Sequence, residues 1–424
     1  MRKIYLFTFM MLLLVHLKGQ AQQITLHVER AGTLHGMINA SRLPYITDLK
    51  LTGELNGTDI SFIRTLVKKN LRFLDLSEAR IVEGGAIYYS NYRTSNDIIG
   101  SYMFYNPDYS PISPCAISKI NLPNSVTGIE EGAFKSCTRL TDINIPNSVT
   151  SIEWATFYSC TSLTDINIPD AVKSIEPETF SGCTRLTDIN IPNSVTSIGY
   201  EAFYNCTRLT DINIPNSVTS IGERAFSGCT SLTDINIPNS VTSIEWATFY
   251  SCTSLTDINI PNSVTSIGGG AFSGCTSLTD INIPNSVTSI ERSTFYDCTS
   301  LTDINIPNSV TSIGEQAFYN CDNLKSVYMN ASTPPFIGSQ AFHNISKDLT
   351  IYIPRGSYTA YWLSYWGNYN LVEYDPTDIQ GVTTSAHNGV EKYFSIDGRP
   401  LPGPCKGVNI IQDTDGKTRK AWIP

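Results

Sequence analysis

The sequence predicts a repeat solenoid, in which the chain winds into a coil and successive turns stack on one another. A 23-residue unit, LTDINIPNSVTSIGxxAFxxCTS, recurs almost unchanged through the middle of the 424-residue chain, and nine cysteines from Cys137 to Cys321 follow its period without a slip. The apolar residues of one unit are too few to form a core alone, so each unit must be covered by the next. In the unit that begins at residue 140, the predicted core side chains are Leu140, Ile143, Ile145, Val149, Ile152, Phe157 and Cys160.

Each unit predicts two short extended segments joined by turns. Ile143 and Ile145 stand two residues apart, which is the spacing of a strand, so we expect a strand over residues 142–145 that Pro146 ends. Residues 149–152 predict a second extended segment, and the IGxxAFxxC piece has room for about one helical or 3₁₀ turn. The order L-x-x-I-x-I-x-x-S-V follows the leucine-rich-repeat pattern, so we expect a β-dominated solenoid.

Residues 1–21 predict a signal peptide. Basic residues at the start precede an apolar stretch from Ile4 to Val15, and Gly19-Gln20-Ala21 forms a small-x-small cleavage site. The apolar stretch is short for a membrane span, and no later segment has an apolar run of spanning length. We therefore expect an exported protein at the cell surface or outside the cell, rather than in the periplasm, with no transmembrane span after cleavage.

Residues 22–116 predict an N-terminal cap with degenerate repeats. Two alternating strand patterns, Leu49–Leu51 and Phe73–Leu76, flank a helix expected over Asp59–Lys69, with Asp59 as its N-cap. Residues 102–105 resemble a degenerate copy of the AFxx step. A solenoid needs such a cap because its first turn would otherwise expose a bare core.

Three further segments complete the predicted organisation. Residues 117–323 hold nine regular repeats, which at strand spacing give a rod about 40 Å long. Residues 324–374 predict a degenerate repeat and a C-terminal cap rich in Tyr and Trp; packing of these aromatics at the end of the rod is favoured over a binding patch. Residues 375–424 alternate at 393–396 and 408–411, which predicts a small β-element.

The composition argues against two classes of function. Without residues 1–21 the chain has 26 basic and 38 acidic side chains, a net charge of −12, so it has no basic stripe for nucleic acid. The four remaining histidines lie outside the repeats, and none belongs to an HExxH motif. There is also no phosphate loop and no GxSxG motif. We therefore predict a protein that is not an enzyme and needs no cofactor.

The cysteines recur once per turn beside Phe and Leu, which predicts buried, reduced thiols that act as small hydrophobic groups. Disulfides between neighbouring turns are the alternative, since stacked strands lie about 4.8 Å apart, within the range that a disulfide spans. A metal site is not indicated, because the sequence has no CxxC motif and no cluster of cysteine with histidine.

The strongest candidate site is formed by the polar positions of the first strand, which all point outward and repeat once per turn. Stacked carboxylates repel one another, and a basic ligand or a cation would relieve that repulsion. Calcium is one such cation, although no calcium-binding loop motif is present. The alternative is a solvated face whose charge discourages aggregation. The tentative binding residues are Asp142, Asn144, Asp165, Asn167, Asp188, Asn190, Asp211, Asn213, Asp234, Asn236, Asp257, Asn259, Asp280, Asn282, Asp303 and Asn305.

Two other sets of equivalent positions in the repeat suggest further predictions. An exposed threonine column, which includes Thr219 and Thr242, suits an outward strand position but also suggests an ice-like or crystalline ligand. At the position after the last isoleucine of the unit, Glu occurs together with Thr three residues later, whereas Gly occurs together with Ala, as in Gly199 and Ala202. Because Gly tolerates positive φ and Glu does not do so readily, this pairing predicts two alternating turn geometries.

The repeat IPNSVTSIGxxAFxxC over residues 117–323 closely resembles the BspA-type leucine-rich repeat family of bacterial surface proteins. The segments DLKLTGELNGTDI and LTIYIPRGSYTAYW are similar to those that flank the repeats in Bacteroidetes members. The C-terminal tail, residues 375–424, resembles short β-domains of exported proteins of that group, and this resemblance implies a role in sorting to the surface. This resemblance implies a right-handed coil and an adhesin-like role, with a host matrix protein, a bacterial partner or a glycan as ligand. It supplies no defined site residues, and a spacer rod without a ligand on its repeats is the rival function.

Overall fold

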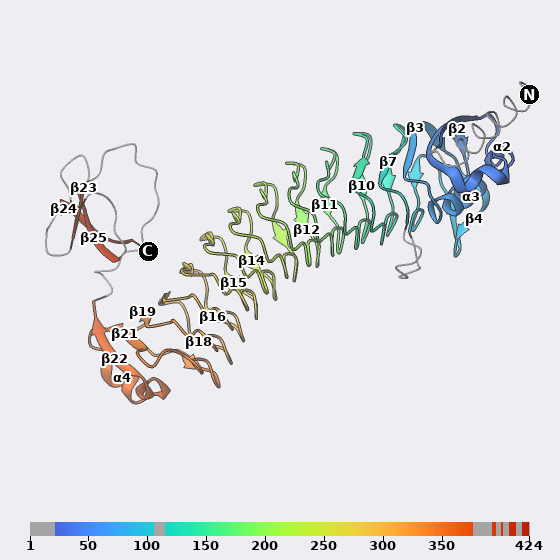
Figure 1. The fold of residues 1–424 in the computed structure, drawn as a ribbon. Helices are drawn as coiled ribbons and strands as arrows, with labels where there is room; N and C mark the ends of the chain where they lie inside the picture. Colours follow the sequence, from blue (N-terminus) through green and yellow to red (C-terminus); the bar gives the residue numbers. More distant parts are fainter. Residues whose placement is uncertain are drawn as a thin grey trace, which may run out of the picture.

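The structure is a computed structural model of the chain. It describes residues 22–105 and 115–375, together with the backbones of four strands within 392–423, so the predicted signal peptide lies outside the described residues. The described chain forms a β-solenoid of about 14 turns with a 23-residue period, and its turns stack in a single elongated row (Figure 1). The predicted fold class is therefore confirmed. None of the helices in the described residues is long and apolar enough to cross a membrane.

The first face of the solenoid carries the DIN segments. At each end of the rod these segments pair as a continuous parallel sheet. The N-terminal sheet has the order β1 (Gln22–Val28), β2 (Ile46–Leu55), β3 (Phe73–Ile81), β7 (Lys119–Asn121) and β9 (Asp142–Asn144). The C-terminal sheet has the order β17 (Asp303–Ile306), β19 (Ser326–Met329), β21 (Thr350–Pro354) and β22 (Asn370–Tyr374).

In the central turns the predicted strand of the DIN segment is wrong. These turns touch on this face through single bridges, such as Asn167 to Asn190 and Asn236 to Asn259. The hydrogen bonds across this face give the reason. In the central turns Thr256 N–H donates to the Thr233 carbonyl at 3.3 Å, whereas beside β9 the equivalent Thr141 N–H donates to the Ser118 carbonyl at 2.8 Å. Hydrogen bonds weaken as they lengthen, so a continuous ladder does not form in the centre.

The second face is a row of two-residue parallel strands at the Ser-Ile step. The predicted extended segment 149–152 is confirmed only over its last two residues, because Val149 N–H donates to the Pro146 carbonyl at 3.1 Å and closes a turn. The strands are β6 (Ile98–Ile99), β8 (Gly128–Ile129), β10 (Ser151–Ile152), β11 (Ser174–Ile175), β12 (Ser197–Ile198), β13 (Ser220–Ile221), β14 (Ser243–Ile244), β15 (Ser266–Ile267), β16 (Ser289–Ile290), β18 (Ser312–Ile313) and β20 (Phe336–Ile337).

The third side consists of tight turns in place of a helix. Within a turn, Cys160 N–H donates to the Phe157 carbonyl at 3.0 Å, and between turns Phe157 N–H donates to the Thr179 carbonyl at 2.9 Å. We call this side the turn edge. On the turn edge, backbone N–H groups of one turn donate to carbonyls of the next turn. These hydrogen bonds join the central turns, whose DIN segments form no continuous ladder.

The expectation of two turn geometries is wrong. The residue two after the variable Glu or Gly has positive φ in both kinds of turn, for example 55° at Glu178 and 50° at Glu201. The glycines instead permit close approach, since a Cβ on Gly222 would lie 2.7 Å from the carbonyl carbon of Gly199. In the Glu turns, the partner threonine donates its hydroxyl to the Glu carbonyl, as Thr179 does at 2.6 Å, so the pairing reflects a hydrogen bond.

The core contains the predicted inward side chains of every repeat and is continuous along the rod. Phe157 and its equivalents form an uninterrupted stack of buried rings from Phe104 to Phe342. Phe104 lies 5.3 Å from Phe134, which confirms residues 102–105 as a degenerate AFxx step.

All ten cysteines of the described residues are free and buried, and Cys405 lies outside that part of the chain. Each ladder thiol donates to the carbonyl of a phenylalanine in the preceding turn, as Cys252 does to Phe226 at 3.2 Å. Burial raises the pKa of Cys183, Cys229 and Cys275 to about 12. The structure therefore has the reduced thiol ladder that the sequence favours.

The N-terminal cap surrounds helix α3 (Gly57–Val67), which lies beside β2 and β3 (Figure 1). The predicted N-cap is wrong by three residues, because Asn56 caps the helix and Asp59 is its third residue. Asp59 completes a capping box by accepting a hydrogen bond from the Asn56 N–H. The other elements of the cap are α2 (Leu34–Met37), η1 (Ala40–Tyr45), β4 (Gly84–Tyr89) and β5 (Tyr92–Thr94).

Replacing Asp59 with alanine is expected to destabilise this cap by about 3 kcal/mol or more. The fully buried carboxylate accepts hydrogen bonds from the N–H groups of Gly32 at 2.5 Å, Leu34 at 3.0 Å and Asn56 at 3.0 Å. Alanine would leave all three donors without a partner, at about 1–3 kcal/mol for each buried group. Hydrogen exchange of β1, β2 and α3 measures the effect, with the exposed Glu54→Ala as control. Unchanged protection in the Asp59→Ala protein would contradict it.

The C-terminal cap contains α4 (Tyr358–Trp362) and η2 (Tyr365–Asn368). Tyr361 and Trp366 are fully buried, and they donate hydrogen bonds to the carbonyls of Ala331 at 2.7 Å and Pro335 at 2.9 Å. These contacts pack two aromatic side chains against the end of the rod, whereas Tyr358, Trp362 and Tyr365 are exposed, so an end cap formed by the whole segment stays a prediction. Within the tail predicted to be a small β-element, an antiparallel sheet has the order β24 (Pro400–Leu401), β23 (Lys392–Ser395), β25 (Gly407–Gln412) and β26 (Thr418–Ile423). Its role in sorting stays a prediction.

Candidate binding surfaces of the solenoid

The structure brings the predicted Asp and Asn positions together on one face, which we call the Asp/Asn face. The alternation of the DIN segment turns its isoleucine into the core and its polar residues to solvent. Among the sixteen predicted residues, Asp280, Asp303 and Asn305 are half-buried, and the other thirteen are exposed. The predicted outward direction of both columns is therefore correct.

The charge on this face is poorly balanced in its centre. At its first turn, Asp142 forms an ion pair with Lys119 at 2.6 Å. In the described part of the chain, no ion pair reaches Asp211, Asp234 or Asp257. The central turns thus present exposed carboxylates whose negative charge is not neutralised by a neighbouring side chain.

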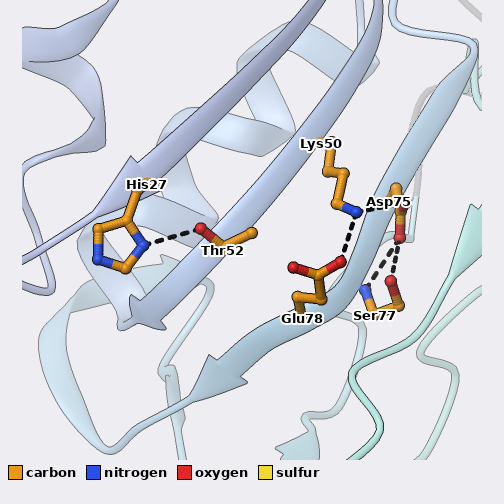
Figure 2. Close-up of polar contacts among 6 residues, drawn as sticks. All are labelled: His27, Lys50, Thr52, Asp75, Ser77 and Glu78. Carbon is orange, nitrogen blue, oxygen red and sulfur yellow. Dashed lines mark hydrogen bonds and ion pairs between the residues drawn. The ribbon is translucent and has the colours of Figure 1, made fainter.

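The N-terminal strands carry a different set of polar groups, whose members form ion pairs and hydrogen bonds with one another. Figure 2 shows Lys50 of β2 reaching across to Glu78 of β3, with an Nζ–Oε1 distance of 2.6 Å, and to Asp75 at 4.0 Å. The Glu78 hydrogen bond raises the pKa of Lys50. On β1, His27 contacts the Thr52 hydroxyl at 2.8 Å (Figure 2). These side chains satisfy one another, so the acidic centre of the rod differs from its N-terminal end.

The exposed threonine column has a structural role that the sequence did not predict. The hydroxyl of Thr219 donates to the Thr196 carbonyl of the preceding turn at 3.2 Å, and Thr265 does the same to Thr242. Serine repeats the pattern, as Ser217 donates to Val195 at 2.6 Å. Because these hydroxyls donate to backbone carbonyls of the preceding turn, they stabilise the stacking of the turns. They are therefore poorly placed to bind an ice-like or crystalline ligand.

The described residues contain no group of three or more His, Cys, Asp and Glu side chains placed to hold one metal ion. The calcium alternative therefore has no cage of protein carboxylates to support it, and it stays a hypothesis about the open face.

The turn edge carries a second set of exposed side chains that the sequence analysis did not single out. Trp154, Tyr200 and Trp246 occupy equivalent positions in different turns and are 36%, 40% and 51% exposed. The sequence does mark these three positions, because the repeat varies there while most of its other positions are nearly constant. The variation could be seen in the sequence, but the exposure of the aromatic side chains could not.

Comparisons with known proteins agree with this geometry. The profile of the BspA type leucine rich repeat region matches six copies, over residues 97–233 and 219–350. A leucine-rich cell-surface protein from Faecalibacterium prausnitzii is 29% identical, over 66% of this chain and 88% of that chain, with a TM-score of 0.42. A leucine-rich repeat protein from Bacteroides ovatus is 28% identical, over 61% of this chain and 92% of that chain, with a TM-score of 0.45.

The pneumococcal vaccine antigen PcpA is 18% identical over 72% of this chain and 89% of that chain, with a TM-score of 0.44. No curated protein matches the chain. The family profile covers more than half of the sequence, and it extends beyond the predicted repeat region at both ends, in step with the phenylalanine stack. The chain therefore belongs to the BspA-type leucine-rich repeat family.

Proposed function

We propose that the protein is exported and acts at the cell surface, or in the medium, as a binding protein of adhesin-like function. Its ligand is a host matrix protein, a bacterial partner or a glycan, recognised through the Asp/Asn face. Solenoids of this kind offer extended surfaces for binding rather than enclosed sites for catalysis. The signal-like residues 1–21 support export, and the cell-surface character of the Faecalibacterium relative supports the location.

The observation that carries the proposal is the row of exposed, unneutralised carboxylates at Asp211, Asp234 and Asp257. Like charges stacked on neighbouring turns raise the energy of the free protein, and a ligand with basic groups relieves that repulsion on binding. A spacer rod gains nothing from this arrangement except solubility. Charge complementarity therefore favours a ligand that presents positive groups at regular intervals.

Neutralising three of these residues tests the proposal. The Asp211→Asn/Asp234→Asn/Asp257→Asn protein is expected to bind its ligand roughly tenfold more weakly, because each exposed charge pair contributes about 0.5 kcal/mol. The measurement is binding of the full-length protein to an array of matrix proteins, mucins and glycans. A higher salt concentration should also weaken binding by the wild-type protein, because salt screens exposed charges.

The matched control removes the same charge elsewhere. Asp170, Asp322 and Asp348 are exposed and lie outside the Asp and Asn columns. Asp170 occupies a turn position at which the other repeats have Asn, so the change to Asn is native to the fold. The triple Asp→Asn protein at these sites should bind as the wild type does. Equal binding by wild type, face variant and control would exclude the Asp/Asn face as the binding surface, and no binding by any of the three would move the assignment to a spacer rod.

A further inference from the structure

The turn edge holds a regular set of aromatic side chains, which we call the aromatic edge. Its outer column is 36–51% exposed, and one tyrosine of its inner column, Tyr250, is 46% exposed. The buried phenylalanine stack already forms the core, so these rings are not needed to close it. The aromatic edge comprises Trp154, Tyr158, Tyr200, Tyr204, Trp246 and Tyr250.

The aromatic edge has a period of two turns. Each of its three pairs of rings is followed by a turn with smaller or polar residues at the same positions, namely Pro177 and Ser181, Glu223 and Ser227, or Gly269 and Ser273. The three serines are buried at the base of the edge, between taller aromatic neighbours. Phenylalanine rings of successive turns are 5.6 and 5.5 Å apart here, so the aromatic pairs recur about every 11 Å.

Polar groups line the intervals between the rings. The Arg224 guanidinium lies 4.7 Å from the Tyr204 ring and 5.8 Å from the Trp246 ring, so it spans the small turn between them. Its Nη1 atom is 2.6 Å from Glu201 Oε1, which also accepts the Tyr200 hydroxyl at 2.8 Å. This network fixes Arg224 and the neighbouring rings in place.

The N-terminal end of the edge repeats the arrangement. Lys135 Nζ lies 5.5 Å from the Trp154 ring and 4.5 Å from the Tyr158 ring. A cation above an aromatic face orders both partners. The cation thus holds both rings in place; Trp154 is 36% exposed and Tyr158 is half-buried.

We propose that the aromatic edge binds an extended β-1,4-linked polysaccharide. The apolar C–H face of a pyranose ring stacks on an aromatic face, and its hydroxyls bond to flanking polar groups. A β-1,4 linkage turns each sugar over relative to the last, so the same face recurs at every second sugar. The spacing of about 11 Å between successive aromatic pairs is close to the length of one such disaccharide unit. An α-1,4-linked chain coils and does not present one face along a straight row.

This site is independent of the Asp/Asn face, which lies on a different side of the repeat and is proposed to bind a basic ligand. The first test uses the full-length protein with cellohexaose, mannohexaose and chitohexaose, and with α-linked maltohexaose for comparison. Tryptophan fluorescence and calorimetry report binding, because Trp154 and Trp246 are two of five tryptophans in the chain. Saturable binding of at least one β-1,4-linked hexaose, and none of maltohexaose, is the expected result.

Variants of the edge provide the decisive comparison. Trp246→Ala is expected to weaken binding roughly tenfold, and Tyr200→Ala on another turn to weaken it independently. Trp246→Ala/Gly269→Trp keeps the number of tryptophans but moves one ring by a single turn. Gly269 is equivalent to Trp246 and has no positive φ, and a Cβ there would lie 3.1 Å from the Arg292 carbonyl oxygen, so the change needs a small shift of that neighbour. This shifted protein should bind no better than Trp246→Ala.

Three results would overturn the proposal: no binding of any β-1,4-linked hexaose, equal binding of maltohexaose, or wild-type affinity in the shifted protein. Thermal unfolding of each variant accompanies the binding data, because exposed rings can be removed without loss of the core. The Asp→Asn protein of the Asp/Asn face should keep its hexaose affinity. Loss of function on one face therefore leaves the other proposal standing.

Discussion

Raising the pH from 8 to 10 is expected to destabilise the solenoid strongly, because its thiol ladder resists ionisation only while it is folded. Burial raises the pKa of Cys183, Cys229, Cys275 and Cys321 to about 12 and that of the alternate ladder cysteines well above the usual range. In the unfolded chain the same thiols ionise near pH 8.5.

The sign follows from proton binding. The unfolded state releases thiol protons above about pH 8.5 while the folded state keeps them, so stability falls with rising pH between about 9 and 12. Each buried thiol then removes about 2 kcal/mol by pH 10. Several such thiols act together, so the loss exceeds the total stability of many domains.

Denaturant unfolding at pH 7, 8, 9 and 10 measures this loss. A Cys229→Ala/Cys252→Ala protein is the control, and its stability should fall less steeply with pH because two titrating groups are gone. Alkylation adds a second readout, since only the thiolate reacts: ladder thiols should be modified only after unfolding. A slope unchanged by the two substitutions, or alkylation of the folded rod at pH 8, would contradict the expectation.

The repeat period was enough to predict the architecture and most of the core. Equivalent positions of a strict repeat share one environment. A prediction that Phe157 and Cys160 are buried therefore applies to the equivalent residue of every repeat, and all of these residues lie in the core. Even the irregular step at Phe104 followed from the pattern. The period, however, says nothing about the hydrogen bonds between turns. Those bonds decide whether Asn167 and Asn190 belong to a strand or meet at a single bridge.

Side-chain bonds between turns were also beyond the sequence. The hydroxyls of Thr219 and Ser217 and the thiol of Cys252 each bond to a carbonyl of the preceding turn. A sequence shows which residues can donate a hydrogen bond, but the partner carbonyl becomes visible only when the turns are stacked. The same limit explains the misplaced cap at Asp59, whose partners include Gly32 and Leu34, far away in sequence.

The sequence likewise predicts some features of the candidate site but not others. The outward direction of the Asp and Asn columns follows from strand alternation and could be predicted. The lack of ion pairs at Asp211 and its neighbours, and the placement of Arg224 between two aromatic rings, depend on packing across turns. Constant positions drew attention in the sequence, whereas the aromatic edge lies at the variable ones.

Replacing Phe226 with alanine is expected to lower the free energy of unfolding by about 3–5 kcal/mol. The ring is fully buried in the middle of the stack, 5.4 Å from Phe203 and 5.7 Å from Phe249. Its removal leaves a cavity that rigid neighbouring turns cannot fill, because their own backbone bonds fix their spacing. Phe226→Leu keeps most of the volume and should cost about 1 kcal/mol.

The position within the rod adds a second expectation. In a solenoid each turn contacts only its neighbours, so a weakened central interface uncouples the two halves. Denaturant unfolding of the Phe226→Ala protein should therefore become broader or separate into two transitions, with hydrogen exchange fastest around the substituted turn. Phe342→Ala, at the last ring of the stack, should fray that end and leave the central transition sharp. A single sharp transition in the Phe226→Ala protein, with little loss of stability, would show that the stack does not couple the turns.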